Sequence, residues 1–121
     1  MEGKIWKLGY YLSIVSIVAI SAHLFWTFNG MLSPEEIRSN LSIPIAAVII
    51  LTGAVGVPKL PVKFRMAYVL LFTSWILVNL ANWTYGQNFQ LSIGLQVIAL
   101  VLGIFAFWKF RRLRSAQGQG L

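Results

Sequence analysis

The chain has 121 residues, of which 58% are hydrophobic and only 11% are charged. Soluble domains carry about 25% charged residues, so this composition excludes a soluble fold, and the length fits a single domain over residues 1–121. The net charge of +7 comes from residues that flank apolar stretches, and with no nucleic-acid-binding motif we expect no nucleic-acid partner. There is no cysteine, which excludes disulfides, thiolate chemistry and iron–sulfur clusters.

Four apolar stretches are predicted to be membrane-spanning helices. The first covers about residues 8–29 and contains the chain's one histidine, His23. The others cover about residues 41–57, 66–85 and 91–110. A helix needs about 20 apolar residues to cross a hydrocarbon core roughly 30 Å thick. We therefore expect an all-α integral membrane protein, folded as a bundle of four transmembrane helices.

A short interfacial helix is predicted on the outer side, after the first span. Ser33-Pro34-Glu35-Glu36 is a typical helix start, because Ser33 suits the N-cap, Pro34 suits the first helical position and Glu36 can bond back to the cap. We interpret the two carboxylates as capping groups. The second span is short, unless it continues from this helix through a kink at Pro44, where the missing N–H frees the carbonyl of Asn40.

The lysines and arginines predict the orientation. Two lie before the first span, three lie between the second and third spans, four follow the fourth span, and Arg38 stands apart from these nine. The positive-inside rule then places both termini in the cytoplasm, or in the matrix or stroma, of a multi-pass protein in a cell or organelle membrane. Residues 109–121 are predicted to be a basic tail. Its expected contacts with anionic lipid headgroups are Lys109, Arg111, Arg112 and Arg114.

Small and polar residues recur at helical spacing in the spans and predict where helices pack closely. The predicted packing residues are Gly9, Ser13, Ser16, Gly53, Gly56, Ala99, Gly103 and Ala106. The cleanest stripe is in the fourth span, where Ser92, Gln96, Ala99, Gly103 and Ala106 follow each other by four or three residues.

A layer of polar side chains is predicted in the outer leaflet. At about 1.5 Å per residue, four of them fall within one slab of the membrane, and Trp75 lies nearer the middle with an indole N–H that needs a partner. The layer consists of His23, Trp75, Asn79, Asn82 and Gln96. It either locks the helices together by hydrogen bonds, or forms a site for a quinone, a small polar ligand or a proton path. A third alternative is that His23 faces a partner subunit or lipid.

Metal and haem sites are not predicted within this chain. Zinc or copper needs further histidine, cysteine or carboxylate ligands, and the spans contain none beside His23. No catalytic constellation and no cofactor motif is present. We therefore expect no catalysis and no cofactor of its own, with a bound quinone or lipid as the open alternative.

The expected function is that of a small accessory subunit of a larger membrane complex, such as a respiratory or other membrane-bound oxidoreductase, with other membrane subunits as partners. One alternative is a small homo-oligomeric transporter or channel. Small multidrug-resistance transporters have this size, but they carry a glutamate in the first helix that this chain lacks. Another alternative is a quinone-interacting redox protein, with His23, Trp75 and Gln96 near the headgroup. The layout of four spans with an amphipathic segment after the first resembles, in architecture only, the DoxX-like quinone-linked membrane proteins.

Overall fold

The apolar stretches form four long helices in the computed structural model, which describes residues 2–30 and 34–118. The elements are α1 (Glu2–Phe28), α2 (Glu35–Gly56), the short 3-10 helix η1 (Val57–Lys59), α3 (Val62–Thr84) and α4 (Phe89–Gly118). The described residues contain no strand. Each of the four α-helices is long and apolar enough to cross a membrane. The chain is therefore all-α, with the build of a multi-pass membrane protein.

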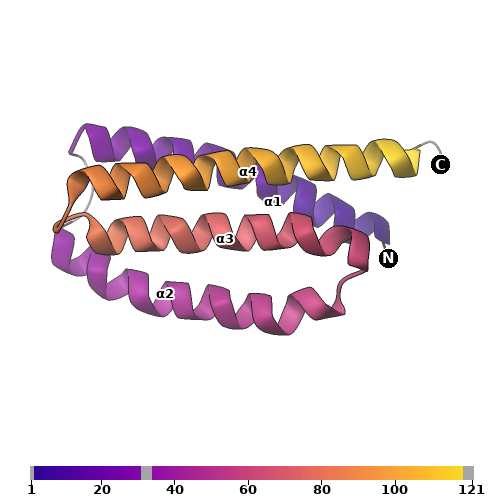
Figure 1. The fold of residues 1–121 in the computed structure, drawn as a ribbon, viewed down its shortest axis with the longest axis horizontal. Coiled ribbons are helices and arrows are strands. Elements are labelled where there is room, and N and C mark those ends of the chain that lie inside the picture. The colour runs from indigo at the N-terminus through magenta and orange to yellow at the C-terminus, as the bar shows by residue number, and fades with distance from the viewer. Residues whose placement is uncertain (1, 31–33, 119–121) are drawn as a thin grey trace.

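The helix α3 is central to the bundle. It packs against α4, α2 and α1, and α4 packs in turn against α1. Figure 1 shows α1 and α4 on one side of α3 and α2 on the other. Within the described residues, α2 touches no α-helix other than α3. The bundle is thus a three-helix unit, α1, α3 and α4, with α2 attached along one edge.

The helices alternate in direction, so both termini and the α2–α3 connection lie at the same end of the bundle (Figure 1). We call this the basic end, because the cations that flank the spans gather there. Arg38 belongs to the start of α2, at the opposite end. The clustering predicted from the sequence is therefore a property of the folded chain.

The expected interfacial helix is not a separate element. Residues 35–40 are the first turns of α2, which continues through Pro44. Pro44 costs the helix one hydrogen bond to the carbonyl of Asn40, but it does not end the helix, and prolines are tolerated within transmembrane helices. The expectation of a separate interfacial helix was wrong, and the alternative of one continuous helix through Pro44 describes α2. Ser33 lies outside the described residues.

The expected basic tail is also largely helical. The fourth helix was predicted to end near residue 110, yet α4 continues to Gly118. The reason is that Lys and Arg are good helix formers, so loss of hydrophobicity past the membrane edge does not end the helix. At the other end, the Asn88 carboxamide oxygen accepts the N–H of Leu91 at 3.0 Å and caps the start of α4.

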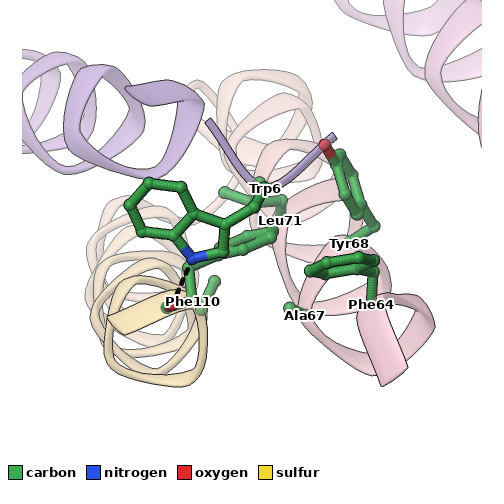
Figure 2. Packing of buried hydrophobic residues seen from close by; sticks show 7 residues of the cluster. Trp6, Phe64, Ala67, Tyr68, Leu71 and Phe110 are labelled. Atoms are coloured by element: carbon green, nitrogen blue, oxygen red, sulfur yellow. Dashed lines mark hydrogen bonds between the residues drawn. The ribbon is translucent and has the colours of Figure 1, made fainter. Parts of the chain in front are cut away.

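An aromatic cluster joins three helices at the basic end (Figure 2). Its buried members are Trp6, Phe64, Ala67, Tyr68, Leu71, Ala106 and Phe110. The Trp6 indole N–H donates to the carbonyl of Phe110, which ties α1 to α4. The Tyr68 hydroxyl donates to the carbonyl of Ile5 at 2.7 Å, which ties α3 to α1. Both aromatic polar groups therefore have a partner away from water, as buried tyrosine and tryptophan require.

The predicted packing residues divide between the two parts of the bundle. Six are buried among α1, α3 and α4: Gly9, Ser13, Ser16, Ala99, Gly103 and Ala106. Gly53 and Gly56 of α2 are only partly buried. A methyl group added at Gly56 would meet nothing within 4 Å. A methyl group added at Gly9 would overlap the ring of Phe110. Gly9 is thus where a glycine is required, because the fully buried Phe110 ring lies directly on the α1 backbone.

We predict that Gly9→Ala destabilises the bundle by about 1–3 kcal/mol, because the added methyl forces Phe110 out of its packed position. The matched control is Gly94→Ala in α4, where an added methyl meets nothing within 4 Å. SDS-induced unfolding in mixed micelles, followed by circular dichroism, measures both. Equal stability of the two variants would contradict the close approach at Gly9.

Candidate functional site

His23 lies on the face of α1 that meets the other two helices of the three-helix unit. Its Nδ1 lies 2.7 Å from Oε1 of Gln96 in α4, and its Nε2 lies 2.8 Å from Oδ1 of Asn82 in α3. One imidazole ring therefore bridges all three helices. His23 and Asn82 are partly buried, whereas Gln96 is completely buried.

The orientation of the Gln96 carboxamide follows from its contact with Ser92. Thr27 Oγ1 lies 3.2 Å from Gln96 Nε2 and 3.3 Å from Gln96 Oε1, so Thr27 does not distinguish the two ends of the carboxamide. Ser92 Oγ donates its single proton to the Ala81 carbonyl at 2.8 Å, which leaves its oxygen to accept. Gln96 Nε2 donates to this oxygen at 3.4 Å, and the carbonyl oxygen of Gln96 then lies toward His23.

This orientation determines which imidazole nitrogen carries the proton. Gln96 Oε1 can only accept, so His23 Nδ1 is the protonated nitrogen. Nε2 meets the carboxamide of Asn82, a group that contains both a donor and an acceptor. The ring is therefore held from both sides, by α4 at Nδ1 and by α3 at Nε2.

Two of the five residues expected in the polar layer lie outside this network. The Trp75 indole N–H donates to Ser16 Oγ at 2.7 Å and forms a separate tie between α3 and α1. Asn79 Nδ2 donates to the Trp75 carbonyl of its own helix at 2.9 Å. The structure thus brings together His23, Asn82 and Gln96, while Asn79 turns toward α2.

Two residues of the network were not assigned to the layer from the sequence. Thr27 and Ser92 both contact the Gln96 carboxamide, and both are almost completely buried. The available signal was their spacing, because Thr27 follows His23 by four residues and Ser92 precedes Gln96 by four. Residues four apart lie above one another on a helix face, and this could have placed both hydroxyls beside the layer.

The chemistry available to this site is hydrogen bonding. The described residues contain no group of three histidine, cysteine or carboxylate side chains that could hold a metal ion. Both ring nitrogens of His23 and the NH₂ group of Gln96 already have partners inside the chain. As arranged, the network joins α1, α3 and α4.

A groove lined by the buried polar side chain of Asn79 lies between α2 and α3. Two adjoining hollows of about 340 and 330 Å³ follow the groove between these helices and share Ile50 as a lining residue. We call them together the α2–α3 groove. Their walls are almost entirely apolar, with Ala46, Ala47 and Trp83 among them. We call the hollow of about 330 Å³, which is farther from the basic end, the outer hollow. Asn79, only 6% exposed, lines it.

The four residues expected at lipid headgroups do not all lie at the same place in the structure. Lys109 and Arg112 line a hollow at the basic end together with Lys63 of α3. Arg111 is exposed and does not line it. The side chain of Arg114 lies outside the part of the chain that the structure describes.

No protein-family model, curated protein or solved structure matches this chain. Its function is therefore argued from the chemistry and packing of its own residues.

We predict that a double-mutant cycle between His23→Ala and Gln96→Ala gives a coupling energy of about 0.6–2 kcal/mol, the range of hydrogen bonds between transmembrane helices. Unfolding in SDS mixed micelles measures it. The control cycle pairs His23→Ala with Asn79→Ala, which share no hydrogen bond. Equal coupling in both cycles would contradict the His23–Gln96 contact.

Proposed function

We propose that this chain is a non-catalytic accessory subunit of a larger membrane complex, and that a partner's transmembrane helix docks along the α2–α3 groove. The observation that carries the proposal is the carboxamide of Asn79. One of its N–H groups bonds to Trp75. Among the described residues no donor reaches its Oδ1, although the side chain is nearly buried. A carbonyl oxygen without a donor is costly in an apolar environment.

The depth of Asn79 favours a protein as the missing partner. Asn79 lies six residues from the middle of α3, or about 9 Å along the axis, which is inside a hydrocarbon core of roughly 30 Å. Lipid chains offer no hydrogen-bond donor at that depth. A transmembrane helix does, through a serine, threonine, asparagine or glutamine side chain.

The attachment of α2 supports the same proposal. Because α2 packs on α3 alone, the groove between them is open along its length. Small residues line it on the α2 side, namely Ala46, Ala47, Gly53 and Ala54. Small residues allow a neighbouring helix to approach its partner's backbone closely. The groove thus combines a hydrogen-bonding group with space for an incoming helix.

The His23 network supports an accessory role over transport or quinone binding. A transport path or a quinone site needs a polar group that faces the ligand. The nitrogens of His23 instead face Gln96 and Asn82, and the Trp75 indole faces Ser16. The residues expected near a quinone headgroup are therefore engaged in joining helices.

The proposal includes an orientation and a class of complex. We infer that the basic end faces the cytoplasm, or the matrix or stroma, by the positive-inside rule. A respiratory or other membrane-bound oxidoreductase is the complex that we expect from the sequence. Absorption spectra of co-purified subunits, which reveal haem or flavin, test that part.

We predict that Asn79→Leu lowers the recovery of partner subunits by about tenfold after mild-detergent extraction from the native membrane, measured by native gel and quantitative mass spectrometry. A hydrogen bond between transmembrane helices is worth up to about 2 kcal/mol, and each 1.4 kcal/mol is a factor of ten. The matched control is Asn29→Leu. Asn29 also donates to the carbonyl four residues earlier, at 2.8 Å, but it is exposed at the end of α1.

Site-specific photo-crosslinking separates docking in the groove from loose association. A photoreactive residue at Ala47, which lines the outer hollow, should give one defined protein adduct, and one at Val55, exposed on α2 outside both hollows, should not. Recovery of a monomer or a small homo-oligomer from native membranes, with adducts only to lipid at both positions, would contradict the proposal.

A further inference from the structure

A hollow at the basic end gathers positive charge from two helices. It has a volume of about 260 Å³ and is lined by Lys63 of α3 and by Lys109, Arg112 and Leu113 of α4. Arg112 and Leu113 follow Lys109 by three and four residues, so the three side chains share a face of α4. Lys63 belongs to the first turn of α3, which begins at Val62. The hollow is thus a meeting point of the start of α3 and the end of the fourth span.

Negative charge within the chain is scarce at this end. The chain has three acidic residues, and two of them, Glu35 and Glu36, begin α2 at the opposite end of the bundle. The third is Glu2, at the start of α1. Nine lysines and arginines thus share this end of the sequence pattern with one acidic residue. Cations that share one hollow repel each other, so an anion from outside the chain is favoured there.

The neighbouring cations have other roles. Arg65 donates to the carbonyls of Leu60 and Pro58, both at 3.0 Å, and so holds the α2–α3 connection. Arg111, next to Arg112 in α4, does not line the hollow. Lys63, Lys109 and Arg112 are therefore distinguished by position and not only by charge.

The surroundings favour a lipid as the source of the anion. Leu113 forms an apolar wall of the hollow, and the guanidinium of Arg112 lies 4.7 Å from the ring centre of Trp108, which is itself half exposed. Tryptophan beside cations at a span's end is typical of the membrane interface. Lys63 lies in the first turn of α3, where the positive end of the helix dipole also favours a negative charge.

We propose that Lys63, Lys109 and Arg112 form a binding site for the phosphate headgroup of an anionic phospholipid, with preference for a headgroup that carries two negative charges. Two phosphate charges neutralise more of the three cations than one can, and the acyl chains extend along the apolar helix surfaces next to Leu113. This site is independent of the α2–α3 groove and of any partner subunit. Of the cations at the end of α4, Lys109 and Arg112 belong to this site and Arg111 does not.

The test compares two double variants that remove the same charge. Lys63→Gln with Arg112→Gln alters the site, and Lys7→Gln with Arg111→Gln alters exposed cations outside it. Binding of cardiolipin, phosphatidylglycerol and phosphatidylcholine to the purified full chain in mild detergent is titrated by native mass spectrometry. At about fivefold per cation near a membrane surface, the site variant should bind cardiolipin about 25-fold more weakly. The control variant should lose less than fivefold.

Each remaining outcome has a defined meaning. Equal losses in the two double variants would overturn the site and leave diffuse attraction. Equal affinity of the unaltered chain for phosphatidylglycerol and cardiolipin would overturn the preference for two charges. Displacement of cardiolipin by an equal concentration of inorganic phosphate would overturn the assignment to lipid. The single variant Lys109→Gln, compared with Lys4→Gln, repeats the comparison if a double variant fails to fold.

Discussion

The structure depends on hydrogen bonds made without water. A polar side chain inside the hydrocarbon core loses several kcal/mol unless another group of the protein satisfies it. The chain meets this constraint with ties at successive depths along α1. Trp6 donates to α4 near the basic end, Trp75 donates to Ser16 nearer the middle, and His23 joins Asn82 and Gln96 toward the other end. These ties fix the rotation of α1 against α3 and α4.

The same constraint explains the asymmetry of the bundle. The ties and the aromatic cluster belong to α1, α3 and α4, whereas α2 packs along α3 alone. Asn79, whose oxygen has no donor among the described residues, lies on the side of α3 that faces α2. The ties thus belong to the three-helix unit, and α2 with the outer hollow is the part of the molecule that we propose for association.

Hydropathy was sufficient to predict four apolar helices, because length and composition determine whether a segment can cross a membrane. Helix ends were less predictable. Pro44 does not end α2, because prolines are tolerated within transmembrane helices. The basic residues after Phe110 stay helical, because lysine and arginine are good helix formers. Periodicity placed His23, Asn82 and Gln96 at one depth, but it could not separate Asn79 from them. Asn79 and Asn82 lie within one helical turn of each other, yet Asn82 contacts α1 and Asn79 faces α2. Only the packing of the helices decides this difference.

The most direct test of this account is the protonation of the single histidine. Nitrogen-15 NMR of the histidine-labelled chain in lipid bilayers contains signals from one imidazole, so both ring nitrogens can be assigned. The account predicts a proton on Nδ1 of His23, because the contact of Gln96 Nε2 with Ser92 turns the Gln96 oxygen toward Nδ1. A neutral ring with its proton on Nε2 would contradict it. Gln96 would then point the other way, and the network would not hold the three helices as described.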